Sequence, residues 1–250
     1  INNLMEKIFD IFIIGAGING AGIARDASGR NLSVCIVDKN KVGSATSSWS
    51  TKLIHGGLRY LESYQFRLVR ESLQEREIIY KIAENIVRPI PFIIPYTKSY
   101  RSKWIIRLGL MLYDIISGKS SLPKSTTINI EKEYPNILKN KFKVGFKYFD
   151  LQVDDKKLVE LNIKDAEKKG ALILENKEIL NIQRDNKNWL IKLNDDKIYK
   201  AKALINASGP WINEVQNNII QISNNKKIRL VKGSHIVTRK LYKQDIAFTC

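Results

Sequence analysis

A chain of 250 residues with 44% hydrophobic and 27% charged residues can bury a core, and its composition is that of a globular protein rather than a disordered one. Two cysteines and two histidines are too few for a disulfide framework, a cysteine metal cluster or a multi-histidine metal site. The formal net charge of +17 comes mostly from lysine, and the abundance of lysine, isoleucine and asparagine is also what an AT-rich coding sequence would produce. The functional interpretation is attraction to an anion, such as an acidic lipid or a phosphorylated substrate; nucleic acid is the weakest option, because no basic stripe with interleaved aromatic residues is present.

The region from residue 10 to residue 38 predicts a strand, a helix and a second strand. The short β-branched run Ile11–Ile14 is typical of a strand buried on both faces of a parallel sheet. A helical stretch, Ala21–Gly29, and a second apolar run, Leu32–Val37, follow it. Cys35 lies within that second run, so we expect a buried, unreactive thiol.

The turn between the first strand and the helix, Gly15-Ala16-Gly17-Ile18-Asn19-Gly20, satisfies the pattern G-x-G-x-x-G. The first glycine permits the tight turn, the second lets the backbone approach a pyrophosphate, and the third lets helix and strand pack closely. The amino terminus of the helix then faces the phosphates. Asp38 ends the second strand, where a carboxylate would accept hydrogen bonds from a ribose. This unit predicts a dinucleotide site but does not separate FAD from NAD.

The middle of the chain begins with a loop and a long amphipathic helix. The loop, Ser44–Thr51, is rich in small hydroxyl residues. The helix is expected from Glu62 to Glu84, and the apolar residues of its predicted inner face are Leu68, Leu73, Ile78, Ile79 and Ile82. Three prolines then end this helix and begin a different region: Pro89, Pro91 and Pro95.

Two further helices and a series of strands are expected. The helices are Trp104–Ile116, which is mostly apolar with basic flanks, and Val153–Lys169, whose opening pair of aspartates suits the helix dipole. Short strands are predicted at Ala171–Leu174, Ile179–Gln183, Trp189–Leu193, Ile198–Ala201, Ala203–Asn206 and Ile228–Val237.

Several segments, in chain order, resemble the membrane-associated, FAD-dependent glycerol-3-phosphate dehydrogenases. The most specific are Ser44–Ser48 and Lys52–Leu61, which together resemble that family's flavin-contacting signature. The likeness continues at Phe66–Val69, Glu75–Glu77, Ser121–Pro123, Val153–Asp155, Asn206–Trp211 and Ile228–His235. The resemblance covers nearly the whole chain, and it implies FAD as the cofactor and no metal.

The resemblance also indicates which residues hold FAD. Small hydroxyl residues at 44–51 would let donors reach the cofactor without bulk, and Ala207-Ser208-Gly209 would bring backbone close to its phosphates. An ordinary strand-to-helix turn is the alternative for that last segment. The expected FAD contacts are Gly15, Gly17, Gly20, Asp38, Thr46, Ser47, Ser48, Lys52, Leu53, Ala207 and Gly209.

The reaction implied by the resemblance is the oxidation of sn-glycerol 3-phosphate to dihydroxyacetone phosphate, with electrons passing on to a membrane quinone. Both histidines fall inside matched segments, and an imidazole can act as a base near neutral pH. His235 is the favoured base and His55 is expected to line the flavin pocket, although either could be structural. Arg59 and Tyr60 would contact substrate oxygens, with a structural ion pair as the alternative for Arg59. Lys232 is a weaker candidate.

The sequence also bears on the membrane. No apolar run approaches the roughly 18 residues needed to span a bilayer, and residues 1–7 lack the features of a signal peptide. Trp104–Ile116 suits a helix lying in the lipid interface, but a buried helix with Arg107 and Asp114 on its polar side fits equally well. The membrane association of the resembled family implies a cytoplasmic protein, peripheral on the inner face of the cytoplasmic membrane.

The expected fold class is α/β. A Rossmann-like FAD-binding domain with a parallel sheet occupies residues 1–90 and 150–222, a helical insertion 91–149, and the start of a mixed-sheet substrate domain 223–250. Proteins of the resembled family are considerably longer, so we expect this chain to be an amino-terminal half, as a fragment or a truncated form. The alternatives are a non-catalytic remnant of such an enzyme and another oxidase of the same flavoprotein class. The oligomeric state stays open, with a homo-oligomer as one option.

Overall fold

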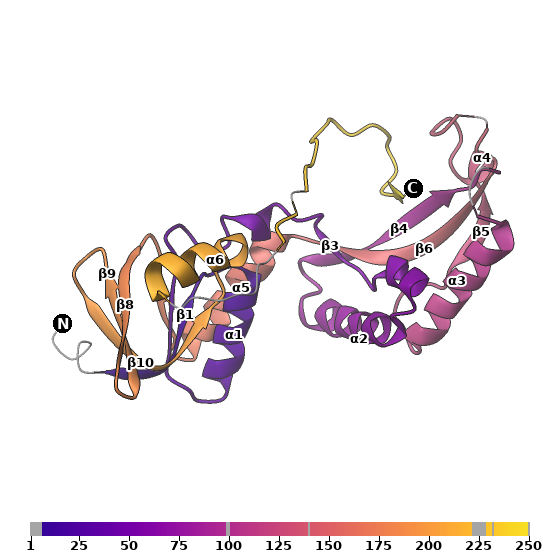
Figure 1. Cartoon of the computed structure of the whole chain (residues 1–250). Coiled ribbons are helices and arrows are strands. Elements are labelled where there is room, and N and C mark those ends of the chain that lie inside the picture. Colours follow the sequence, from indigo (N-terminus) through magenta and orange to yellow (C-terminus); the bar gives the residue numbers. More distant parts are fainter. Residues whose placement is uncertain (1–6, 99–100, 140, 222–228, 232, 250) are drawn as a thin grey trace. The chain divides into compact units, whose positions relative to one another are not determined.

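The computed structural model describes residues 7–98, 101–139, 141–221, 229–231 and 233–249 (Figure 1). They fall into two compact units. The first unit comprises Ile1–Thr51 and Asp155–Ser234, and the second unit comprises Lys52–Asp154 and His235–Cys250. These boundaries differ from those of the predicted domains, because residues 52–90, which the prediction joined to residues 1–51, belong to the same compact unit as residues 91–154.

A six-stranded sheet forms the centre of the first unit. The strands β7, β2, β1 and β10 run parallel, and β9 and β8 continue the sheet in the antiparallel sense. This arrangement confirms the predicted α/β class with a parallel sheet. In sheet order the strands are β7 (Leu172–Leu174), β2 (Val34–Val37), β1 (Ile8–Ile14), β10 (Ile198–Asn206), β9 (Asn188–Leu193) and β8 (Ile179–Asp185).

The side chains of the central strands alternate between two cores, one on each face of the sheet. Ile13 and Ile36 pack with the helices α1 (Ile18–Gly29) and α5 (Asp155–Lys168). Their neighbours Phe12 and Cys35 belong to the other core, which also contains residues of β8, β9 and the π-helix η5 (Val215–Ile220). Because both faces are covered, these strands are apolar at successive positions. Burial raises the pKa of the Cys35 thiol, which agrees with the expected unreactive cysteine.

Two predicted strands of the first unit prove to be one. The expected strands 198–201 and 203–206 form the continuous strand β10, which pairs with β1 along its length from Lys200 to Asn206. A strand predicted at 228–237 is wrong within its described part, since residues 229–231 and 233–237 have no regular secondary structure. After β10 the chain forms the short helices η4 (Gly209–Trp211) and α6 (Ile212–Glu214).

The second unit is built on a smaller sheet covered by two helices. Its strands follow the order β11 (Ala247–Phe248), β4 (Val87–Pro95), β6 (Val144–Val153) and β3 (Leu53–Ile54), and β5 (Thr126–Asn129) also pairs with β6. The helices α2 (Phe66–Ile82) and α3 (Lys103–Ser117) share a core with β4 and β6. Residues 91–149, predicted as a helical insertion, contain the helix α3 together with β5 and parts of β4 and β6. The short helices are η3 (Leu58–Ser63) and α4 (Ile130–Glu133).

Prolines lie within β4 rather than in a loop that precedes a new region. Pro89, Pro91 and Pro95 lie opposite Leu151, Phe149 and Gly145 of β6, but the hydrogen bonds at the two ends of this pairing involve the even-numbered Ile86 and Tyr96. Ile93 is odd-numbered like the prolines, so its backbone groups point to the same side of β4 as theirs. Its carbonyl oxygen accepts a hydrogen bond from Thr249 N, on the side of β4 that faces away from β6. The missing N–H groups of the prolines therefore point away from β6, so the ladder between β4 and β6 loses no donor.

The inner face of α2 differs from the predicted one. Val69, Leu73 and Arg76 are buried, whereas the predicted inner residues Ile78 and Ile82 are exposed. The prediction failed because a charged residue, Arg76, occupies an inner position, and hydrophobic periodicity counts such a residue as outward-facing. Of the predicted inner residues, only Leu73 is fully buried.

Truncation of one residue on each face of α2 tests this assignment. Leu73→Ala should destabilise the protein by about 2–5 kcal/mol, because it opens a cavity in the core. Ile82→Ala, at a position that is 61% exposed, should change stability by no more than about 0.5 kcal/mol. Urea denaturation of the two variants measures the difference, and equal effects would contradict the observed face.

Candidate functional site

A glycine turn at the carboxyl end of β1 forms the centre of the first unit's candidate site. Gly15 has a left-handed backbone (φ +98°), and a Cβ added there would lie 2.6 Å from the carbonyl oxygen of Ala207. A Cβ on Gly20 would overlap the carbonyl oxygen of Gly15, and one on Gly17 would lie 3.0 Å from Ser47 Oγ. Gly15 and Gly20 are therefore required by close packing against backbone, whereas a side chain at Gly17 would need only a small shift of Ser47.

Asp38 lies beside this turn, directly after β2. Its Oδ2 atom accepts a hydrogen bond from Ala16 N at 2.8 Å, and its Oδ1 atom accepts one from Asn40 N at 2.9 Å. Each carboxylate oxygen has further lone-pair capacity, so both can also accept from a ribose hydroxyl. The carboxylate thus fixes the turn and remains suited to the predicted ribose contact.

The hydroxyl-rich loop joins the amino terminus of α1. Ser47 Oγ accepts a hydrogen bond from Ile18 N at 3.0 Å, while Ser48 Oγ donates to the carbonyl oxygen of Gly43. Ser50 Oγ donates to Asp155 Oδ2 at 2.7 Å, which ties the loop to the start of α5. Thr46 is exposed at the start of the short helix η2 (Thr46–Ser48). Ser47 therefore lies against the glycine turn, and contact of Thr46, Ser47 and Ser48 with FAD stays a prediction.

The segment after β10 reaches the same edge of the sheet. Ala207 N donates to the carbonyl oxygen of Ile14 at 2.8 Å, which places Ala207 against the glycine turn. Ser208 Oγ donates to Asn206 Oδ1 at 2.6 Å and stabilises the turn. Gly209 also has a left-handed backbone (φ +59°), and among the described residues, apart from its chain neighbours, no atom lies within 4 Å of an added Cβ. Its backbone conformation, rather than crowding by those residues, is therefore the reason for this glycine.

These features fit a dinucleotide. The carboxyl ends of β1, β2 and β10 meet at the glycine turn, where open-sheet α/β proteins bind such ligands. The first turn of α1 has no acidic residue to compete with a phosphate for its N–H groups. The site thus offers backbone donors for phosphates from α1 and acceptors for a ribose from Asp38.

The remaining predicted site residues belong to the second unit. Leu53 lies in β3, opposite Gln152, and Lys52 O accepts a hydrogen bond from Val153 N at 2.9 Å. Gly57 is left-handed (φ +72°) and leads into η3, which contains Arg59 and Tyr60. The side chains most suited to chemistry are exposed: His55, Arg59, Tyr60 and His235.

His55, Arg59 and Tyr60 lie on one continuous loop, and His235 belongs to the same compact unit. Lys232 lies outside the described residues. A buried aspartate, Asp150, was not predicted as a site residue; its Oδ1 atom accepts a hydrogen bond from Gly56 N at 3.3 Å. A signal was available, because Asp150 lies between Phe149 and Leu151, and a carboxylate is rarely buried among such residues without a partner.

Comparison with known proteins shows which family the chain matches. A model of the family described as FAD dependent oxidoreductase matches residues 10–249. The aerobic glycerol-3-phosphate dehydrogenase of Escherichia coli (strain K12) is 42% identical over 244 residues, covering 96% of this chain and 48% of that protein. The D-erythritol 1-phosphate dehydrogenase of Brucella abortus (strain 2308) is 42% identical over 239 residues, covering 93% of this chain and 48% of that protein. The chain spans about half the length of these curated relatives.

Solved structures share the fold. The glycerol-3-phosphate dehydrogenase from Bacillus halodurans complexed with FAD superimposes with a TM-score of 0.63 at 27% identity, over 87% of this chain and 37% of that chain. The glycine oxidase from Geobacillus kaustophilus gives a TM-score of 0.68 at 21% identity, over 86% of this chain and 59% of that chain, and this likeness concerns the fold alone.

Two glycine substitutions test the turn. Gly15→Ala should destabilise the protein by at least about 1–2 kcal/mol, because a left-handed backbone is unfavourable for alanine and its Cβ meets Ala207. It should also weaken FAD binding, since the turn must shift. Gly22→Ala is the matched control within α1, where nothing lies within 4 Å of an added Cβ, and it should stabilise by about 0.5–1 kcal/mol. Denaturation and FAD fluorescence titration measure both; unchanged FAD affinity in Gly15→Ala would contradict the assignment.

Proposed function

The chain belongs to the FAD dependent oxidoreductase family, and from that premise we propose that the intact protein oxidises sn-glycerol 3-phosphate to dihydroxyacetone phosphate. The observation that carries the proposal is the likeness to the Escherichia coli glycerol-3-phosphate dehydrogenase along nearly the whole chain. The residues at the glycine turn support the flavin part of the proposal, because Asp38 can accept from a ribose and the amino terminus of α1 can donate to phosphates, as the adenosine diphosphate half of FAD requires.

The chain's own residues take distinct roles in the proposed reaction. Gly15, Gly17 and Gly20 let the backbone approach the pyrophosphate, and Asp38 accepts from the ribose. Ser47 and Ala207 flank the turn, and the other proposed contacts are Thr46, Ser48, Lys52, Leu53 and Gly209. FAD, when bound, supplies the acceptor for the hydride that leaves carbon 2 of the substrate. A membrane quinone is the proposed final acceptor of the two electrons.

His235 is the proposed base that takes the proton of the substrate hydroxyl as carbon 2 is oxidised. His55 is proposed to line the flavin pocket from the loop that follows β3. Arg59 presents a guanidinium, which suits bidentate contact with a phosphate, and Tyr60 presents a phenol to a substrate oxygen. The exposure of all four side chains supports these roles, because a substrate-binding group must be reachable from solvent.

A second candidate substrate is D-erythritol 1-phosphate. The Brucella abortus relative that bears this substrate in its name matches the chain as closely as the Escherichia coli enzyme does. Both names describe dehydrogenases of a phosphorylated polyol, so the two proposals share their chemistry and differ in the length of the polyol.

Anaerobic reduction of the intact, FAD-loaded protein tests the function. Glycerol 3-phosphate should bleach the visible flavin absorption and yield dihydroxyacetone phosphate, and D-erythritol 1-phosphate should do so with a lower kcat/KM. The reverse ranking would favour the second candidate, and no bleaching by either substrate would reject both.

In the same assay His235→Asn should slow bleaching by about 10²–10⁴-fold, which is the usual contribution of a general base. A rate equal to that of the unaltered protein would reject the base assignment.

We also propose that the intact protein rests on an acidic lipid surface through α3. An apolar stripe runs along the exposed side of this helix, and basic residues, Arg101, Lys103 and Lys119, flank it at both ends. Trp104 at its start is 83% exposed, and the stripe continues with Ile105, Leu108, Met111 and Ile115. Apolar residues flanked by cations suit the boundary between acyl chains and anionic headgroups. No helix in the described part of the chain has the length and apolar character to cross a bilayer.

Co-sedimentation of the intact protein with vesicles tests this contact. Binding should be stronger to phosphatidylglycerol vesicles than to phosphatidylcholine vesicles, and Trp104→Glu/Leu108→Glu should reduce it at least about 10-fold, since charges oppose apolar insertion. Leu180→Glu/Ile198→Glu, at exposed apolar positions of the first unit, is the matched control and should bind normally. Equal loss in both variants, or binding unaffected by the α3 change, would contradict the role of α3.

A further inference from the structure

A charged pair lies inside the second unit, away from water. Arg76 on α2 and Asp150 on β6 are 2% and 3% exposed, and Arg76 Nη1 donates to Asp150 Oδ1 at 2.7 Å. The desolvation of two charges offsets much of their attraction, so apolar residues of similar volume would often give an equally stable core. Stability alone is therefore a weak reason for burying charge at this place.

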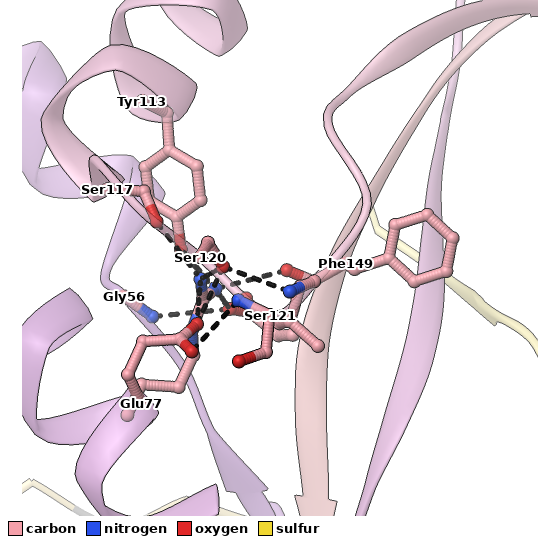
Figure 2. A network of polar contacts seen from close by, with 10 residues as sticks. Gly56, Glu77, Tyr113, Ser117, Ser120, Ser121 and Phe149 are labelled. Atoms are coloured by element: carbon pink, nitrogen blue, oxygen red, sulfur yellow. Dashed lines mark hydrogen bonds and ion pairs between the residues drawn. The ribbon is translucent and has the colours of Figure 1, made fainter.

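Asp150 Oδ1 gathers donors from three different elements. Besides Arg76 Nη1 it accepts hydrogen bonds from Tyr113 Oη on α3 at 3.2 Å and from Gly56 N at 3.3 Å. Figure 2 shows Gly56 and Tyr113 among the residues of this polar network. Arg76 Nη1 also donates to the carbonyl oxygen of Phe149 at 3.1 Å, which fixes the guanidinium against β6. Burial raises the pKa of Asp150, and Arg76 acts against that rise.

Gly56 has no freedom to leave this contact by a small adjustment. An added Cβ would collide with Leu73 and with Tyr113 Oη, so its backbone rests directly on α2 and α3. Its neighbour Gly57 adopts a left-handed backbone, which turns the chain into η3. The backbone at Gly56 is thus buried, while the side chains of His55 and Arg59 on either side of the glycine pair are exposed.

A second set of contacts anchors the opposite side of the guanidinium. Arg76 Nη2 lies 3.5 Å from Ser117 Oγ and from Ser120 Oγ. Glu77 accepts a hydrogen bond from Ser120 Oγ at 2.6 Å and one from Ser121 N at 3.0 Å. Glu77, Ser120 and Ser121 appear together in Figure 2. The segments Glu75–Glu77 and Ser121–Pro123, to which the proposed function gives no role, therefore meet beneath the His55–Gly57 loop.

From this convergence we infer that Asp150 is a positioning residue that holds the His55–Arg59 loop for its contact with flavin and substrate. Arg76 supplies the countercharge that the buried carboxylate needs, and Asp150 Oδ1 holds the amide of Gly56. The exposed side chains on either side of the glycine pair then project from a fixed backbone. The inference rests on the proposed function, because that proposal gives the loop its flavin and substrate contacts.

Two double variants of the intact protein separate positioning from stability. Arg76→Met/Asp150→Asn and Arg76→Met/Asp150→Leu both remove the buried charges at similar volume. Only the asparagine keeps an acceptor for Gly56 N. The amide hydrogen exchange of residues 52–61, the visible flavin spectrum, and kcat and KM are measured for both. The melting temperature shows whether each variant folds.

The leucine variant should exchange the Gly56 amide at least about 10-fold faster than the asparagine variant. It should also shift the flavin spectrum and lower kcat by about 10–100-fold, since misplacement of about 1 Å in a site can cost 100-fold in rate. The asparagine variant should resemble the unaltered protein in the exchange of the Gly56 amide, in the flavin spectrum and in kcat. Indistinguishable exchange, spectra and kcat in the two folded variants would overturn the inference.

A control and an independent measurement complete the test. Asp114→Asn changes a carboxylate on α3 that accepts from Ser125 N and Ser125 Oγ rather than from Gly56, and it should leave the flavin spectrum unchanged. If the leucine variant does not fold, amide hydrogen exchange at Gly56 is measured in the unaltered protein instead. A Gly56 amide that is not protected from exchange there would overturn the inference. Bleaching of the unaltered protein by glycerol 3-phosphate separately decides the proposed function, so the two failures are distinguishable.

Discussion

The pairing of β1 with both of its neighbours is the constraint on which the dinucleotide site depends. β1 lies between β2 and β10 in parallel, so residues far apart in sequence, Gly15, Asp38 and Ala207, reach the same edge of the sheet. Backbone hydrogen bonds from Gly15 N to Val37 O and from Ala207 N to Ile14 O extend this pairing just beyond the strands. The space left between these backbones is too small for a side chain at Gly15 or Gly20. Sheet pairing therefore determines where glycine is required, and the glycines in turn leave the amino terminus of α1 open to phosphates.

The parts of this fold that could be predicted from sequence are those governed by local chemistry. The β-branched run before Gly15 and the glycine spacing after it are sufficient to predict a strand, a turn and a helix, and the structure contains all three. Cys35 could be placed in the core because its neighbours are all apolar. The FAD prediction needed more than this, since a glycine turn also suits NAD; it depended on the resemblance of the segment 52–61, and the family comparison confirmed it.

The failures arose where tertiary contacts override local pattern. The inner face of α2 was misplaced because Arg76 points inward, where its charge is paired with Asp150, in a strand far along the chain. The prolines of β4 suggested a break, yet each lies where a strand can lack its N–H group without losing a bond to β6. Asp150 itself was missed for the same reason: its donors come from α2, α3 and the loop after β3, and no single segment of sequence contains two of them.

In each of the two units an aspartate accepts a hydrogen bond from a backbone N–H of a glycine-containing loop, but one aspartate is partly exposed and the other is buried. In the first, Asp38 accepts the N–H of Ala16 within a glycine-rich turn; in the second, Asp150 accepts the N–H of Gly56 beside another glycine. Asp38 is only partly buried, so solvent stabilises its charge and it needs no countercharge to remain an acceptor. Asp150 is almost fully buried, where a lone carboxylate would be strongly disfavoured, and Arg76 makes the charged form tenable. A buried carboxylate that accepts from the Gly56 amide therefore needs the Arg76 guanidinium beside it. Glycine at position 56 in turn lets the backbone come close enough for that hydrogen bond.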